Sequence, residues 1–220
     1  IEESREVKMQ TKKRIILGSA SPRRRELLEQ IGISFEVRVS DKEEVYHSLI
    51  PEEIVKELAL SKAENVADDL REKQEQVKQI SFDKKNNVLL DTIVIGADTI
   101  VVSDGSILGK PKDEADAVRM IRSLQGRSHK VYTGVAILDY DDEGKRKSVV
   151  HAVETEVFVN PMSDEEIREY AATGEPLDKA GAYGIQGQFA AYIERIDGDY
   201  YNVVGLPVSY VYRQLKEIAE

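Results

Sequence analysis

Short apolar runs with the character of buried strands alternate along this chain with segments whose apolar residues recur at helical spacing. The strand-like runs lie at 14–18, 93–97 and 131–138, whereas helical spacing follows Pro51 and Asp113. Interleaving of this kind is typical of a sheet covered by helices. We therefore predict an α/β fold, or an α+β fold with a mixed sheet.

Helix boundaries are marked by residues with known capping preferences. Ser21 suits an N-cap, Pro22 suits the first helical position, and Gly32 suits the end of the same helix. Asp113 suits the N-cap of the helix that follows it, and Ser163 and Glu166 have the spacing of a capping box. The sequence therefore predicts a helix at 22–31 and a second one from 164 onward.

An Asp-Gly pair near the end of the chain predicts a β-hairpin. Asp197-Gly198 lies between the strand-like stretches 189–196 and 200–204. A final helix is expected after Pro207.

Composition limits both the size of the fold and its partners. The chain has 220 residues, enough for one sizeable domain or for two small lobes that share a cleft. Its 31 basic and 41 acidic residues give a net charge of −10, which argues against nucleic-acid and membrane-surface binding. The absence of cysteine removes disulfides, thiolate catalysis and zinc–thiolate sites. Without an apolar run of membrane-spanning length or a signal-peptide core, we expect a soluble, cytoplasmic protein.

Basic residues are concentrated near the start of the chain, where six fall within 12–25. Ser19 and Ser21 lie in a turn of small residues before a helix whose first turn holds Arg23 and Arg24. Because cations oppose the helix dipole at this end, a bound phosphate would resolve the conflict. The alternative is that Arg24 and its neighbour Arg25 simply face water.

A carboxylate and a hydroxyl, Asp98 and Thr99, close the apolar run at 93–97. Ligands of open α/β sheets bind at the carboxyl ends of strands. An Asp in this place can hold a divalent cation or orient a water for attack on phosphorus. On spacing alone, a turn-capping Asp is an equally good interpretation.

Lys110 follows a second hairpin signal, and the length of that hairpin loop decides its partner. A three-residue loop at 103–105 places Asp98 opposite Lys110, whereas a two-residue loop at 104–105 places Thr99 there. A functional Asp–Lys pair favours the longer loop, which we predict. The alternative is an ordinary surface lysine.

Residues 174–187 contain four glycines among charged residues, which suggests a loop folded closely around a ligand. The Gln186 amide offers both a donor and an acceptor, which suits the edge of a pyrimidine base. A tight structural loop with a solvated Gln186 remains an open alternative.

Glu44 and Lys62 are weaker candidates. The pair Glu43-Glu44 follows a strand-like stretch and could bind a metal, or it could belong to a solvated face. Lys62 lies on an expected helix, where an exposed lysine is the default.

Six motifs in this order closely resemble the Maf family of nucleoside triphosphate pyrophosphatases. The resemblance covers about 14–215 and is carried by residues 15–28 (IILGSASPRRRELL), 95–101 (IGADTIV), 108–111 (LGKP), 126–135 (GRSHKVYTGV), 175–187 (EPLDKAGAYGIQG) and 198–207 (GDYYNVVGLP).

The resemblance implies a fold, an activity and a set of partners. The run 178–187 is similar to the branch that hydrolyses dTTP and UTP, rather than to the 7-methyl-GTP branch. The family implies cleavage between the α- and β-phosphates, giving a monophosphate and pyrophosphate. It further implies Mg²⁺ or Mn²⁺, a mixed twisted sheet with two lobes around a cleft, a homodimer, and a cytoplasmic role in clearing non-canonical nucleotides.

The resemblance also implies roles for individual residues. The proton acceptor of the family corresponds to Asp98, which with Glu44 matches the metal site. Specificity positions are matched by Arg23, Thr99 and Gln186. Phosphate-contacting positions are matched by Arg24, Lys62 and Lys110, and Ser19 lies in the same substrate-binding turn as the arginines.

The chain departs from the family in three places. Residues 71–91 are longer than the usual connection, which we interpret as a surface insertion. Gln125 replaces a common serine, and Gln188-Phe189 replaces a smaller pair just after the glycine-rich segment. We expect a single domain over 14–220, preceded by a flexible extension at 1–13.

A second functional hypothesis is a non-catalytic nucleotide-binding regulator of cell division that acts through a protein partner, because the family is linked to septum formation. Intact Asp98, Glu44 and Lys110 favour catalysis, since a pure sensor could lose the acids.

Overall fold

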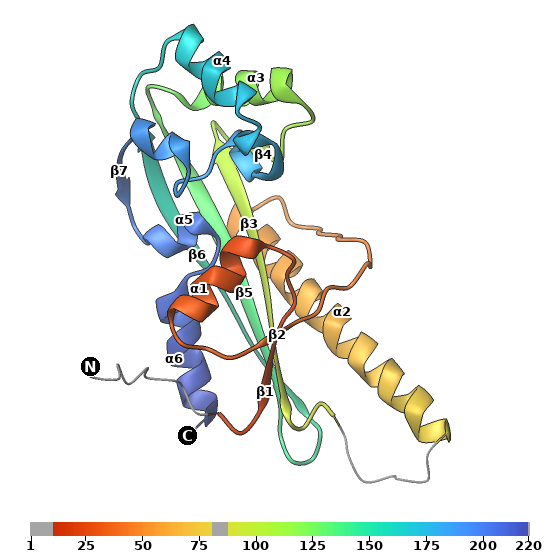
Figure 1. Cartoon of the computed structure of the whole chain (residues 1–220). Coiled ribbons are helices and arrows are strands. Elements are labelled where there is room, and N and C mark those ends of the chain that lie inside the picture. Colours follow the sequence, from red (N-terminus) through yellow and green to blue (C-terminus); the bar gives the residue numbers. More distant parts are fainter. Residues whose placement is uncertain (1–10, 81–87, 220) are drawn as a thin grey trace, which may run out of the picture.

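The computed structural model describes residues 11–80 and 88–219, which form a mixed α/β fold around a seven-stranded sheet (Figure 1). The strands are β1 (Arg14–Leu17), β2 (Glu36–Val37), β3 (Thr92–Ser103), β4 (Ser106–Leu108), β5 (Ser128–Tyr140), β6 (Arg146–Val159) and β7 (Ile193–Asp197). The α-helices are α1 (Pro22–Gln30), α2 (Pro51–Ile80), α3 (Glu114–Leu124), α4 (Asp164–Ala172), α5 (Tyr200–Val204) and α6 (Val208–Ala219). Three short 3₁₀ turns are η1 (Glu175–Asp178), η2 (Ala180–Ala182) and η3 (Gln188–Tyr192).

The sheet is mixed, as the interleaved sequence pattern predicted. Its strand order is β2-β1-β3-β5-β6-β7, with β4 paired to β3 outside this path. β1 runs parallel to both β2 and β3, and the other pairs are antiparallel. Helices connect the parallel strands, and short turns join β3 to β4 and β5 to β6. The antiparallel strand β5 is reached through α3, and β7 is reached through α4 and the 3₁₀ turns.

Alternation along β3 separates two hydrophobic layers. Ile93 and Ile95 belong to the core on the α1, α3, α4, α5 and α6 side, whereas Val94 packs with α2. A Cβ added to Gly96 would lie 2.2 Å from the carbonyl oxygen of Ala59, so the missing side chain lets α2 approach the strand closely.

No helix in the described ranges is both long and apolar enough to cross a membrane.

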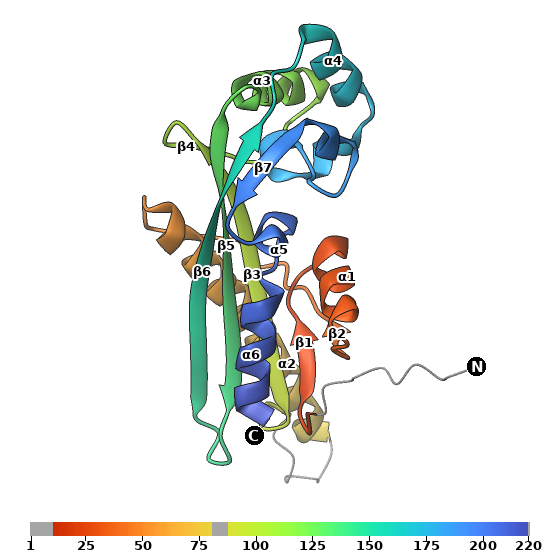
Figure 2. The ribbon, with the colours of Figure 1, turned by 90° about the vertical axis from the view of Figure 1, so that its left-hand side faces the viewer.

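The long strands β3, β5 and β6 run through two lobes (Figure 2). One lobe carries α1, α2 and α6, and the other carries α3, α4, β4 and the 3₁₀ turns (Figure 1). Segments far apart in sequence therefore meet where the lobes adjoin.

The predicted capping signals are confirmed at α3 and α4. The Asp113 carboxylate accepts from the Asp116 amide, and Ser163 and Glu166 form the complete capping box. Ser21 precedes α1 as predicted, but its side chain makes no capping bond.

Both hairpin predictions need correction. β3 and β4 are joined by the two-residue turn Asp104-Gly105 with Ser103 opposite Ser106, so the predicted three-residue loop is wrong. Asp104 and Gly105 both have positive φ, 49° and 73°, as the favoured two-residue hairpin turns require. Asp98 and Lys110 are consequently not cross-strand partners.

Residues 200–204 form α5 rather than the second strand of a hairpin. The Asp199 carboxylate accepts from the Tyr201 amide, which caps the helix. The residues before β7 are likewise helical, because 188–192 form η3.

The segment 71–91 is only partly described. Residues 71–80 continue α2, and residues 81–87 lie outside the described ranges, as do 1–10 of the predicted extension. Leu89 is 2% exposed and packs in the α2-side core, so the segment also supplies a buried side chain.

Candidate active site

A cavity of ≈ 490 Å³ lies where the two lobes adjoin. This volume is within the range of small-molecule sites. All nine site residues predicted from the sequence line it: Ser19, Arg23, Arg24, Glu44, Lys62, Asp98, Thr99, Lys110 and Gln186.

The cavity opens beside a gap in the pairing of β3. One edge of β3 pairs with β1 up to Ile95 and with β4 from Val101 onward, and no strand pair in the described residues covers 96–100 on that edge. Asp98 and Thr99 point to opposite faces of the strand, yet both line the cavity because this edge is open. The gap thus explains how two adjacent residues serve one site despite the two-residue turn.

On the α2 side of the strand, two carboxylates share one lysine. Lys62 Nζ lies 2.6 Å from Asp98 Oδ1 and 3.2 Å from Glu44 Oε1. The Asp98 and Lys62 side chains are only 14% and 20% exposed, so water screens their attraction weakly. Lys62 is therefore not the free surface lysine of the alternative interpretation.

Two protein carboxylates form a small but suitable donor set for a hard divalent cation. No group of three or more His, Cys, Asp or Glu side chains able to hold a metal occurs in the described residues. Mg²⁺, however, is commonly held by one or two carboxylates together with substrate phosphates and waters. Asp98 and Glu44 fit that pattern.

On the opposite face, Arg24 is 8% exposed and joins three segments. Its guanidinium donates to Ser19 Oγ at 3.0 Å, Thr99 Oγ1 at 3.0 Å and the Gly205 carbonyl at 2.8 Å. Burial lowers the pKa of Arg24, and the nearby Asp98 carboxylate opposes that shift. Arg24 thus does not face water, and it positions two other cavity residues.

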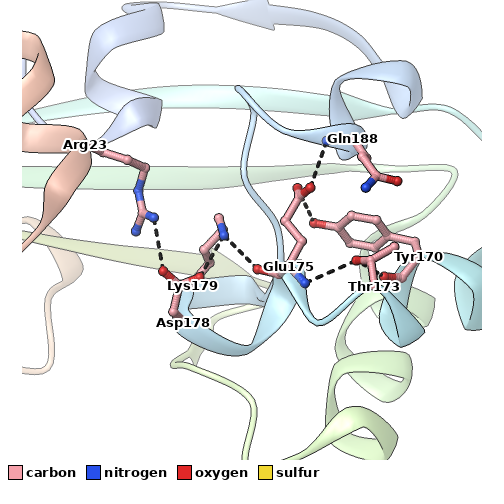
Figure 3. A network of polar contacts seen from close by, with 7 residues as sticks. All are labelled: Arg23, Tyr170, Thr173, Glu175, Asp178, Lys179 and Gln188. Atoms are coloured by element: carbon pink, nitrogen blue, oxygen red, sulfur yellow. Dashed lines mark hydrogen bonds and ion pairs between the residues drawn. The ribbon is translucent and has the colours of Figure 1, made fainter.

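The start of α1 also faces the cavity, which Ser21, Pro22 and Arg23 line. Because Ser21 makes no side-chain cap, the first N–H groups of the helix remain available to an anion. Arg23 Nη1 lies 3.4 Å from Asp178 Oδ2 across the cavity (Figure 3). We call Ser19–Arg24, Glu44, Lys62, Asp98 and Thr99 the charged wall.

Opposite the charged wall, residues 178–187 form what we call the loop wall. Lys179 Nζ donates to the Glu175 carbonyl and to Asp178, both at 2.7 Å (Figure 3). Gly181 N donates to the Gly109 carbonyl at 3.1 Å, which ties the loop to the segment carrying Lys110. Gln186 is exposed at the cavity.

Some lining residues were not singled out from the sequence: Lys42, Asn65, Asp178 and Lys179. Asp178 and Lys179 lie in the glycine-rich segment, and their charges were an available signal. Lys42 and Asn65 lie in a loop and on a helix with no local pattern that marks them.

A family model described as "Maf-like protein" matches residues 14–218. Among curated proteins, the chain is 46% identical over 204 residues to the dTTP/UTP pyrophosphatase of Agathobacter rectalis, covering 93% of this chain and 97% of that one. It is 48% identical over 208 residues to the dTTP/UTP pyrophosphatase of Bacillus cereus, covering 93% of this chain and 90% of that one.

Among solved structures, the chain aligns with the Ham1 protein of Staphylococcus aureus at 14% identity and a TM-score of 0.34. The alignment covers 66% of this chain and 72% of that one. These values are too low to carry an argument. The family match and the relatives over nearly the whole length decide the assignment: the chain belongs to the Maf family.

Proposed function

We propose that this protein is a nucleoside triphosphate pyrophosphatase that hydrolyses dTTP and UTP to the monophosphate and pyrophosphate. The names of its relatives support this substrate class. The observation that carries the proposal is the carboxylate pair Asp98 and Glu44, bridged by Lys62 beside the open start of α1. The cationic groups of this cavity can bind a polyphosphate, and the carboxylates beside them can accept the proton of a hydrolytic water.

In the proposed reaction, the oxygen of a water molecule attacks the α-phosphorus, and the bond from that phosphorus to the α,β-bridging oxygen breaks. The bridging oxygen leaves with pyrophosphate. Asp98 accepts the proton of the attacking water and orients its lone pair. Lys62, 2.6 Å from Asp98 Oδ1, holds that carboxylate in place.

The triphosphate is held by fixed charges and dipoles. In this proposal Arg23, Arg24 and Lys110, which line the cavity, bind phosphate oxygens together with the first N–H groups of α1 and stabilise the charge that develops on them. Ser19 forms part of the same turn. Arg23 exchanges its weak contact with Asp178 for a phosphate when substrate enters.

Asp98 and Glu44 are the residues that would hold Mg²⁺ or Mn²⁺. The bound ion would polarise the phosphate and neutralise the leaving pyrophosphate.

In this proposal the base is recognised mainly by Gln186 of the loop wall. The Gln186 amide can donate to a carbonyl oxygen of uracil or thymine and accept from its ring N–H. Thr99 and Arg23 line the cavity as the other specificity positions.

We also propose that the protein acts in the cytoplasm as a homodimer. Sedimentation analysis would test the dimer.

The deciding experiment is a pyrophosphate-release screen over the common nucleoside triphosphates with Mg²⁺, with Mn²⁺ and with EDTA. We expect release from dTTP and UTP that requires a divalent cation. Preference for a purine nucleotide would overturn the role of Gln186. Tight nucleotide binding with no metal-dependent hydrolysis would favour the nucleotide-binding regulator instead.

A further inference from the structure

The loop wall is tied to α4 by a carboxylate that does not line the cavity. Glu175 Oε1 accepts from the Tyr170 hydroxyl at 3.1 Å, and Glu175 Oε2 accepts from the Gln188 backbone N–H at 3.0 Å (Figure 3). Tyr170 is 4% exposed on α4, and Gln188 follows Gln186 by two residues. One side chain thus joins a packed helix to the end of the loop.

The same carboxylate fills the space over Gly187. A Cβ added there would meet Glu175 first, at 2.0 Å from Oε1 and 2.4 Å from Cδ. The backbone of Gly187 has φ −93° and ψ −157°, which other residues adopt, so the contact rather than the conformation requires glycine. Glu175 therefore packs directly against the residue that follows Gln186.

Glu175 is itself held at every polar group. Its N–H donates to Thr173 Oγ1 at 3.1 Å, and its carbonyl accepts from Lys179 Nζ at 2.7 Å (Figure 3). Burial raises the pKa of Tyr170, and the negative charge of Glu175 raises it further, so the Tyr170 hydroxyl stays protonated and donates. The carboxylate has little freedom to move, and neither has the chain that it contacts.

We infer that Glu175 is a positioning residue that fixes the Gln186 amide and thereby sets the preference of this site for uracil and thymine over cytosine. The inference rests on the proposed function and deepens it. Cytosine presents a donor where uracil presents an acceptor, so a Gln side chain distinguishes them only when its orientation is held. Glu175 acts through Gly187 and Gln188, since it does not itself line the cavity.

The loop has other anchors that keep it folded without Glu175. Tyr183, at the centre of the loop, hydrogen-bonds His129 on β5 at 2.7 Å, and Gly181 is bonded to Gly109. Loss of the carboxylate should therefore free the end of the loop rather than unfold it.

The test measures kcat and KM for UTP and CTP in the full chain with Mg²⁺, comparing wild type with Glu175→Ala and Tyr170→Phe. We expect the UTP/CTP ratio of kcat/KM to fall at least fivefold in Glu175→Ala, through a higher KM for UTP and with kcat changed less than threefold. Tyr170→Phe keeps the ring and should show a smaller fall. Glu169→Gln, at an exposed position beside Tyr170, is the matched control and should leave the ratio unchanged.

Gly187→Ala provides a second route to the same displacement, because its methyl group would push the carboxylate aside. We expect it to lower the UTP/CTP ratio alone and to have little further effect when combined with Glu175→Ala. Independent effects of the two substitutions would overturn the inference. An unchanged ratio in Glu175→Ala would also overturn it, and if that variant does not fold, an unchanged ratio in both Tyr170→Phe and Gly187→Ala would do so.

The outcomes separate this inference from the proposed function. A wild-type protein that hydrolyses no triphosphate refutes the function. The inference is then tested by equilibrium binding of UTP and CTP analogues with a non-hydrolysable α,β-methylene bridge, where Glu175→Ala should lower the binding ratio at least fivefold. An active wild type with unaltered variants refutes only the inference.

Discussion

The charged wall and the loop wall face the same cavity, but different forces hold them. In the charged wall, Asp98 lies on β3, Lys62 on α2 and Arg24 on α1. Sheet pairing and helix packing fix the backbones of these elements. The loop wall contains the end of η1, the short turn η2 and irregular chain, and it is held by side-chain hydrogen bonds, among them those of Glu175, Lys179 and Tyr183. We expect the reaction to depend on the packed elements, and the choice of base to depend on the side-chain hydrogen bonds of the loop wall.

The largest effect is expected from a substitution that removes a catalytic group of the charged wall and leaves the loop wall intact. Asp98→Asn should lower kcat for UTP by about 10³, because removal of a proton-accepting group of this kind typically costs 10²–10⁴. Pyrophosphate release measures the loss, and circular dichroism should show an intact fold. Asp142→Asn, an exposed carboxylate outside the cavity, should retain wild-type turnover. Substantial activity in Asp98→Asn would refute the role of this residue.

Acidification should weaken the loop wall through His129, which is 3% exposed and bonded to Tyr183. Burial lowers the pKa of His129 to about 4, below the unfolded value of about 6.5. Its neutral form therefore contributes stability that is fully present above about pH 6.5. About 3 kcal/mol is lost as the pH falls to about 4, because the unfolded state binds the proton first.

Urea unfolding of wild type and His129→Gln checks this prediction. The difference between their unfolding free energies should narrow by more than about 2 kcal/mol between pH 7 and pH 4.5. A difference that stays constant over this range would show that His129 is protonated in the folded protein as readily as in the unfolded one.

A substitution in the sheet should test how far the charged wall depends on packing. The methyl group of Gly96→Ala would lie 2.2 Å from the Ala59 carbonyl oxygen and 2.8 Å from the Ala63 amide nitrogen. Overpacking of this kind costs about 1–3 kcal/mol and should separate Lys62 from Asp98, lowering kcat as well. Thermal unfolding and turnover measure the two effects.

The matched control for this variant is Gly109→Ala. A Cβ at Gly109 meets nothing within 4 Å, so stability should be unchanged. Equal destabilisation by both substitutions would mean that close approach of α2 to β3 is not what Gly96 provides.

The smallest effect is expected from the exposed end of the loop wall. Gln186→Ala should reduce the preference for UTP over CTP about tenfold, since a net hydrogen bond contributes about 0.5–1.5 kcal/mol. The unfolding midpoint should not move, because Gln186 is exposed. An unchanged UTP/CTP ratio would move base recognition away from this residue.

Local signals in the sequence predicted most of the elements, and the family resemblance was needed as well for the members of the site. Capping patterns placed α3 and α4 because a cap is decided within four residues. Charge at a helix start and position at a strand end mark Arg23, Arg24 and Asp98 as candidates, whereas the roles of Glu44 and Lys62 come only from the resemblance to the Maf family. All nine candidate residues line one cavity, and their roles are part of the proposed function.

The errors fall where distant contacts decide. The β3–β4 turn was assigned from an assumed Asp98–Lys110 pair, whereas the backbone of Asp104 and Gly105 allows the tighter turn. Residues 200–204 have strand-like side chains, but they follow the Asp199 cap and pack as α5. The bonds of Arg24 to Thr99 and Gly205 span 75 and 181 residues, which no short pattern encodes.

Within the described residues, a stretch of β3 lacks a partner strand on one edge because its parallel neighbour there, β1, is only four residues long and ends before Gly18. The length of β1 therefore determines how much of β3 a nucleotide can reach. Removing one residue from the end of β1 would widen the opening on this edge, and adding one would narrow it. Changing the length of β1 is thus a way to redesign the size of nucleotide that this fold can bind.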